Sequence, residues 1–251
     1  MLHEHRWGHG PKIVLVHGWV LGGREAWRAQ HPLTERWTLI APDMPGHGAS
    51  PPGRHDAERY AVAIRDQLLE QPVHLVGHSY GAIVAMLAAA ARPNFIRSLT
   101  VVEPPATRTA IDDPDVRRFD AEVRRLCADP GEDLVGLLQR FFAVAGVPVE
   151  ISEPLPPPLE LGARAIPGAR PPGDVEIPLA RLARAPFPML VVTGGHLRAF
   201  EVIGDAIATA TGAERRVVRG AGHLVPNTGP PFNELLESFL SSTSVDPQPG
   251  R

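Results

Sequence analysis

Short apolar segments that alternate with helical segments constrain the fold of this chain more than any other feature of its sequence. Six short, largely apolar segments are spread along it: Lys12–His17, Trp37–Pro42, Pro72–Ser79, Ser98–Glu103, Pro188–Thr193 and Glu214–Val218. Segments of this kind are typical of strands buried on both faces, because helices cover each side of a parallel sheet. The pattern therefore predicts a parallel sheet.

Helical segments lie between most of these strands. We expect helices over Asp56–Glu70, Tyr80–Ala91, Ala199–Ala210 and Pro231–Leu240. Alternating strands and helices predict an α/β fold, with a doubly wound, mostly parallel sheet and helices on both of its faces.

The interval from residue 104 to residue 186 breaks the alternation. Its periodicity indicates two amphipathic helices followed by a proline-rich stretch, which favours irregular, extended connections. The apolar faces consist of Val116, Phe119, Val123 and Leu126 in the first helix and Leu134, Leu137, Leu138, Phe141 and Phe142 in the second. We interpret 104–186 as a cap inserted into a single domain that spans 1–251, with a core of 1–103 and 187–240. Residues 241–251 are expected to form a frayed tail.

Composition narrows the classes of function. The 251 residues carry a formal net charge of −3, so electrostatics give no reason to expect a nucleic-acid partner. The single cysteine, Cys127, excludes an intramolecular disulfide, and the sequence has neither an apolar signal segment nor a run of about 18 apolar residues. We therefore expect a cytoplasmic protein that acts on a small-molecule substrate without a membrane partner. Its oligomeric state stays open.

The segment Gly77–Gly81, with the sequence GHSYG, is the strongest indication of chemistry. It matches the pattern G-x-S-x-G between an apolar strand and an alanine-rich helix. Flanking glycines allow a sharp turn that holds Ser79 in a strained backbone conformation, beside a helix N-terminus that favours developing negative charge. Ser79 is therefore the candidate nucleophile.

Two other turns open on the same edge of the predicted sheet. His17 and Gly18 end the first strand, so the backbone N–H groups of Trp19 and Tyr80 are the expected oxyanion hole. The last strand is followed by the sequence GAGH, and its glycines permit a tight loop that brings the ring of His223 to the serine hydroxyl. His223 is the expected general base.

With these three turns in order, the chain resembles the α/β-hydrolase fold family from Lys12 to Leu240. The loop Asp43–Ser50 is similar to the loop after the second core strand of that family. The resemblance implies a serine nucleophile elbow and the chain order nucleophile, acid, histidine, with Ser79 before His223. It is more specific for the fold than for the substrate.

The position of the triad acid departs from the pattern of most relatives. Their acid follows the penultimate strand, but residues 194–200 of this chain contain no carboxylate. Some relatives carry the acid at the end of the strand after the nucleophile helix. Glu103 ends that strand here, from where it could accept a hydrogen bond from His223. A carboxylate at the end of an apolar strand needs a partner. Glu103 is the preferred acid; Glu201, Asp205 or no acid at all are the alternatives.

These residues predict a serine esterase that cleaves a small or medium apolar ester, a lactone or a related acyl bond through a Ser-His-acid catalytic triad and an acyl-enzyme. Phe141, Phe142 and His196 are expected to line the substrate pocket. No clustered ligand spacing indicates a metal or a cofactor. Two other classes stay open: a small-molecule binding protein or receptor with the same fold, and a non-hydrolytic lyase or cyclase.

Overall fold

The computed structural model of the chain describes residues 1–128 and 133–243, so most of the predicted tail lies outside the described residues. Seven strands of the described chain form one sheet, in the order β1-β3-β2-β4-β5-β6-β7. The strands are β1 (His3–Trp7), β2 (Lys12–Val16), β3 (Thr38–Asp43), β4 (Val73–His78), β5 (Ile96–Val102), β6 (Met189–Thr193) and β7 (Glu214–Val217). Only β1 and β3 pair antiparallel in this sheet. The predicted mostly parallel sheet is confirmed.

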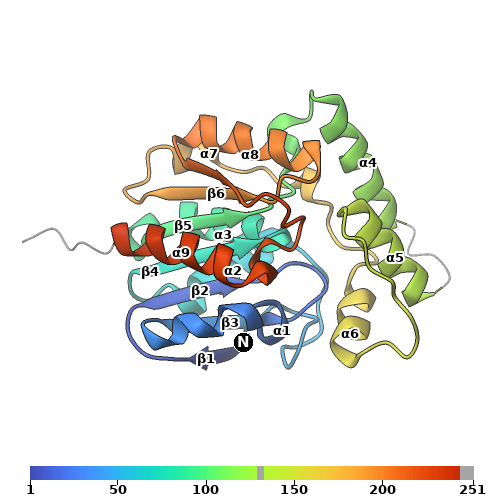
Figure 1. Ribbon diagram of the computed structural model, residues 1–251, viewed down its shortest axis with the longest axis horizontal. Coiled ribbons are helices and arrows are strands. Elements are labelled where there is room, and N and C mark those ends of the chain that lie inside the picture. The colour runs from blue at the N-terminus through green and yellow to red at the C-terminus, as the bar shows by residue number, and fades with distance from the viewer. Residues whose placement is uncertain (129–132, 244–251) are drawn as a thin grey trace, which may run out of the picture.

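The interior strands are apolar because helices cover both of their faces (Figure 1). In β2, Val14 and Val16 belong to the hydrophobic cluster on one face, whereas Ile13 and Leu15 belong to the cluster on the other. This alternation follows from the pleat, which directs successive side chains to opposite faces. The sequence therefore needs a continuous apolar segment for each interior strand.

The two edge strands differ from these expectations. The prediction that each strand is buried on both faces is wrong for β7, because most of its residues are exposed. Strand β1 has no counterpart among the predicted strands, because its sequence HEHRW is polar rather than apolar. Polar and charged residues suit an edge strand, since they discourage pairing with other chains.

The helices form layers on either side of the sheet. They are α1 (Gly23–Ala26), α2 (Ala57–Leu68), α3 (Tyr80–Ala91), α4 (Pro114–Ala128), α5 (Leu134–Val144), α6 (Pro157–Ala165), α7 (Leu179–Leu182), α8 (Arg198–Thr211) and α9 (Pro230–Ser242). Residues of α2, α3 and α8 belong to one hydrophobic cluster, and residues of α9 belong to the other, with Trp27 and Trp37. None of the helices in the described ranges has the length and apolar composition that crossing a bilayer would require.

The chain between β5 and β6 contains α4, α5, α6 and α7. Figure 1 shows α4, α5 and α6 gathered at one end of the sheet. The predicted apolar face of α4 is buried, as are Leu137 and Leu138 of α5, while Leu134, Phe141 and Phe142 are half-buried. Helix α7 instead contacts α3 and α8. The boundaries proposed for a cap, residues 104 and 186, stay a prediction.

Helix α6 corrects the expectation of irregular, extended structure in the proline-rich stretch. Pro156 precedes the helix, and prolines occupy its first turn, where a backbone N–H would have no helical partner to lose. Helix α6 lies directly on the loop after β2, because a Cβ atom at Gly162 would be 1.8 Å from the carbonyl oxygen of Val20. The chain between β5 and β6 thus contacts the backbone next to Trp19.

Candidate active site

Ser79 lies at a sharp turn between β4 and α3. Its φ of 55° and ψ of −126° are costly for a residue with a side chain, and its N–H donates to the carbonyl of Val102 on the neighbouring strand, 2.8 Å away. Both glycines of the elbow are needed because backbone atoms of neighbouring segments approach them too closely for a side chain. A Cβ at Gly77 would lie 2.3 Å from the carbonyl oxygen of Gly81, and a Cβ at Gly81 would lie 2.3 Å from that of His17. The turn therefore presents Ser79 at the sheet edge.

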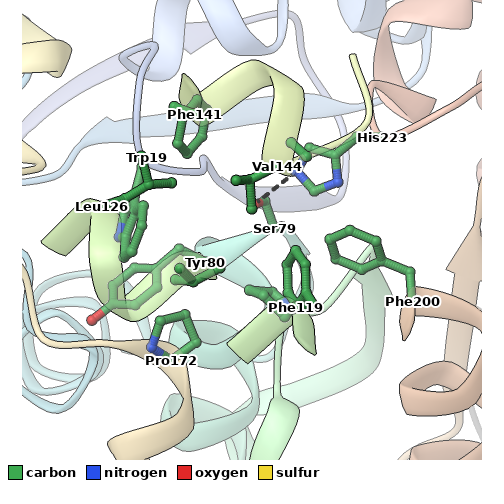
Figure 2. Close-up of a pocket in the computed structure, with 13 residues that line it drawn as sticks. Trp19, Ser79, Tyr80, Phe119, Leu126, Phe141, Val144, Pro172, Phe200 and His223 are labelled. Carbon is green, nitrogen blue, oxygen red and sulfur yellow. Dashed lines mark hydrogen bonds between the residues drawn. The ribbon is translucent and has the colours of Figure 1, made fainter. Parts of the chain in front are cut away.

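His223 reaches Ser79 from the loop after β7. Its Nε2 is 3.0 Å from Ser79 Oγ, the hydrogen bond drawn in Figure 2. The carbonyl of His223 accepts a hydrogen bond of 2.8 Å from Nε2 of His78, a residue of the elbow itself. Burial lowers the pKa of His223 to about 3, and the neighbouring His196 contributes in the same direction. A neutral imidazole next to a hydroxyl is the arrangement of a general base.

Glu103 follows β5 and contacts His223 directly. Its Oε2 is 3.1 Å from His223 Nδ1, and its Oε1 accepts a 2.6 Å hydrogen bond from the N–H of Gly194. Its φ is 50°, and among the described residues only Ser79 and Glu103 are non-glycine residues with positive φ. When Glu103 accepts a hydrogen bond from Nδ1–H, the proton stays on Nδ1, and Nε2 of His223 is free to accept a proton from Ser79.

The alternative acids are engaged elsewhere. Glu201 Oε2 is 2.7 Å from Arg215 Nη2, and its Oε1 accepts the N–H of Gly195 at 3.1 Å. Asp205 also pairs with Arg215, at 3.0 Å. The structure thus brings Ser79, His223 and Glu103 together and keeps Glu201 and Asp205 in a separate ion-pair network.

The loop after β2 lies beside Ser79 and is held by buried histidines. His17 Nδ1–H donates to the carbonyl of Gly18 at 2.7 Å, while its Nε2 accepts the N–H of Met44 at 2.9 Å. A ring N–H of His47 donates to the carbonyl of Trp19. In a trans peptide the C=O and the following N–H point in opposite directions. Fixing the Gly18 carbonyl therefore also fixes the direction of the Trp19 N–H.

Two pockets meet at Ser79 and His223. The first is partly open to solvent and has a mostly apolar lining. Figure 2 draws the residues that line it: Trp19, Ser79, Tyr80, Pro105, Phe119, Val123, Leu126, Phe141, Val144, Ala145, Pro172, Phe200 and His223. The second pocket is lined by Phe141 and Phe142 together with His78 and Leu21, among others. Phe141 thus belongs to both pockets and Phe142 to the second only.

Sequence reasoning missed part of this lining. Phe119, Val123 and Leu126 were placed on the apolar face of a helix without a role at the site, and this face of α4 supplies one wall of the first pocket. Periodicity identifies the buried face of a helix but not whether a cavity lies beneath it. His196, expected in the pocket, is not part of either lining. Its Nε2 is 2.9 Å from the carbonyl oxygen of Ala145, and its Nδ1 is 3.8 Å from Glu103 Oε2.

The described residues contain two groups whose ligand atoms lie close enough together to hold a metal ion. One joins His3, His5 and Asp43 at the edge of the sheet, and the other joins Glu103, His196 and His223. In the second group, His223 Nδ1 and Glu103 Oε2 already share a hydrogen bond.

The neutral state of His17 leads to a pH prediction. Burial, the main cause, and the nearby His47 lower the pKa of His17 well below its ordinary 6.5. Below pH 6.5, His17 of the unfolded chain binds a proton, whereas His17 of the folded chain stays neutral. The free energy of unfolding should therefore fall as the pH falls, by up to about 1.4 kcal/mol per pH unit. We expect His17→Asn to lose less stability than the wild type between pH 7 and pH 5, as measured by urea denaturation.

The matched control is His9→Asn, because the His9 side chain is exposed. This variant should follow the wild-type pH dependence. An identical pH dependence for the wild type and His17→Asn would contradict the prediction.

Comparisons with known proteins identify the family of the chain. The family model described as "Alpha/beta hydrolase family" matches residues 13–233. A pimeloyl-[acyl-carrier protein] methyl ester esterase of Methylococcus capsulatus is 30% identical, over 94% of this chain and 97% of its own length. An alpha/beta hydrolase from Sphaerobacter thermophilus has a TM-score of 0.65 at 26% identity, covering 95% of both chains. An N-acyl homoserine lactonase in complex with N-butanoyl homoserine has the same TM-score at 22% identity, covering 98% of this chain and 94% of its own. The chain belongs to the alpha/beta hydrolase family.

Proposed function

We propose that this protein is a serine hydrolase that cleaves a small or medium apolar ester or lactone through a covalent acyl-enzyme. The observation that carries the proposal is the pair of hydrogen bonds that links Ser79 Oγ to His223 and His223 to Glu103. The relative from Methylococcus capsulatus, which is named a methyl ester esterase, supports the same bond type.

In the proposed reaction, Ser79 Oγ attacks the carbonyl carbon of the substrate while its proton passes to His223 Nε2. The N–H groups of Trp19 and Tyr80 stabilise the charge that develops on the carbonyl oxygen. His223 then gives the proton to the departing oxygen, which leaves the acyl group on Ser79. Water attacks this ester with His223 again as the base, releasing the acid and restoring the hydroxyl.

The two pockets support an apolar substrate whose two ends diverge from the reacting carbonyl. Both pockets include Ser79 and His223, so a substrate bound at Ser79 could extend into each of them. The aromatic and aliphatic lining of the first pocket offers few hydrogen bonds, so binding there would depend on burial of apolar surface.

The nucleophile is tested by Ser79→Ala. Removal of the hydroxyl should lower kcat for a short-chain nitrophenyl ester by about 10⁶. A fluorophosphonate probe should label the wild type at Ser79 and leave the variant unlabelled. Ser241→Ala, at the end of α9, is the control and should retain full labelling. Labelling at a different serine would overturn the assignment, and binding of esters without turnover by the wild type would favour a binding protein.

The acid is tested by comparing two substitutions. Glu103→Gln preserves the shape but replaces one carboxylate oxygen with an NH2 donor. The remaining oxygen is needed by the Gly194 N–H, so the NH2 faces His223 Nδ1 and favours the wrong tautomer, and kcat should fall by up to about 10⁴. Glu201→Gln removes a carboxylate that pairs with Arg215 and should change kcat little. Nitrophenyl ester kinetics on both variants decide the matter, and the reverse ranking would refute the role of Glu103.

The pocket is tested with Phe141→Ala and Phe142→Ala. Because Phe141 lies between both pockets, its truncation should alter the dependence of kcat/KM on both acyl and alcohol chain length. Phe142→Ala is the matched control, since it lines only the second pocket and should alter one of the two profiles. A loss of thermal stability with unchanged profiles would mean that both rings only pack the helix onto the core.

A further inference from the structure

Two histidines of the edge strand β1 face Asp43 at the end of β3 (Figure 1). In the antiparallel pair of these strands, His3 lies directly opposite Asp43, and His5 follows two residues later on the same face. His5 Nε2 is 3.2 Å from Asp43 Oδ2, and one ligand atom from each of the three residues lies within 4.8 Å of the other two. The register of the edge strand thus brings two imidazole rings to one carboxylate.

We propose that His3, His5 and Asp43 form a binding site for one Zn²⁺ ion. The site lies at the edge of the sheet, apart from the proposed triad, and no step of the proposed reaction uses it. A bound ion fastens the N-terminal strand β1 to the end of β3.

The spacing of the donor atoms fits the coordination of zinc. Tetrahedral Zn²⁺ binds imidazole nitrogens and carboxylate oxygens at about 2.0–2.2 Å, which places neighbouring ligand atoms about 3.3 Å apart. The 3.2 Å between His5 Nε2 and Asp43 Oδ2 matches that separation, so an ion can take the place of the shared proton with little movement of either residue. The side chain of His3 is exposed and free to turn toward the ion. Water then completes the fourth position.

Backbone groups hold the Asp43 carboxylate in place. Only 1% of its side chain is exposed; Oδ1 accepts the N–H of Gly23 at 2.8 Å, and Oδ2 accepts the N–H of Ala49 at 3.1 Å. A carboxylate oxygen has two lone pairs, so Oδ2 keeps one for an ion. Hydrogen-bonded outer partners of this kind orient a ligand and strengthen metal binding.

The histidine ligands are also ordered. The ring of His5 stacks on Trp7, with 5.5 Å between centroids and 8° between planes, and its side chain is 19% exposed. The ring of His3 meets that of His5 edge-on at 4.7 Å. The backbone N–H of His3 donates to Ser50 Oγ, which in turn donates to the carbonyl of Asp43. Little side-chain freedom of His5 is therefore left to lose when an ion binds.

No basic side chain competes with an ion for this carboxylate. Within the described chain, Asp43 has no ion pair with lysine or arginine, and its partner at salt-bridge distance is His5. Arg6 lies on the opposite face of β1 and pairs with Glu4 at 2.7 Å. The sequence gave no sign of the site, because β1 lacks a strand pattern and Asp43 is 38 residues from His5.

The other group of possible ligands, Glu103, His196 and His223, is a poorer site for an ion. Their side chains are 0%, 14% and 6% exposed, so an ion lacks the open path that the exposed His3 provides. Both ring nitrogens of His223 are already engaged, with Glu103 and Ser79. This group therefore serves as the control.

Titration calorimetry of the intact, metal-free protein, without a polyhistidine tag, tests the site. One Zn²⁺ ion should bind per chain, whereas Mg²⁺, which prefers oxygen ligands, should not. Zn²⁺ should also raise the Tm, by roughly 5–10 °C at a concentration about 100 times its Kd. Absence of Zn²⁺ binding would overturn the proposal, and binding with an unchanged Tm would refute the fastening of β1.

Four variants assign the ligands. His5→Gln keeps a donor for Asp43 but offers no imidazole, and His3→Gln changes an exposed side chain, so both should fold. Each should weaken Zn²⁺ binding by about 100-fold or more, since loss of a mere outer partner already costs about 10–100-fold. His9→Gln, an exposed histidine of the same segment, and His196→Gln, from the other group, should bind as the wild type does. Wild-type affinity in His3→Gln or His5→Gln, or loss of binding in His196→Gln, would refute the site.

Discussion

The hydrogen bonds of the buried Glu103 carboxylate are the interaction on which the rest of the site depends. One oxygen accepts a hydrogen bond from the N–H of Gly194, in the turn after β6. The other accepts a hydrogen bond from the ring of His223, in the loop after β7. The residue itself ends β5, the strand next to that of Ser79. One side chain thus ties together three consecutive strand ends of the sheet. Because a buried carboxylate needs such partners, the loops that supply them are held in register.

Hydrogen bonds also decide which ring nitrogens carry protons. His17 must donate from Nδ1, because the carbonyl of Gly18 only accepts, and it must accept at Nε2, because the N–H of Met44 only donates. The ring of His223 has side-chain partners instead: an ionised Glu103 accepts a hydrogen bond from Nδ1–H, which leaves the lone pair of Nε2 facing Ser79. Backbone groups cannot reverse their roles, so they impose tautomers that side-chain partners alone would leave variable.

Much of the fold could be predicted from the sequence, because interior parallel strands and the nucleophile turn have strong local signals. The preference for Glu103 over Glu201 and Asp205 came from the acid position of some relatives together with the expected place of its strand beside that of Ser79. Strand β1 could not be found, since an edge strand needs no apolar pattern. Helix α6 was missed because prolines in a first turn are compatible with a helix but resemble a linker. The pocket wall on α4 depends on how the insertion packs, which is a tertiary property with no periodic signal.

The turn after β6 explains physically why Glu103 and Glu201 are not interchangeable. The consecutive N–H groups of Gly194 and Gly195 bind different carboxylates, Glu103 from β5 and Glu201 from α8. A side chain at Gly194 would collide with the backbone of Gly222, since its Cβ would lie 1.9 Å from that carbonyl oxygen, and Gly195 has a φ of 71°. Both glycines are therefore required for a turn tight enough to separate the two acids. One acid is directed to His223, whereas the other is directed to an arginine that neutralises it.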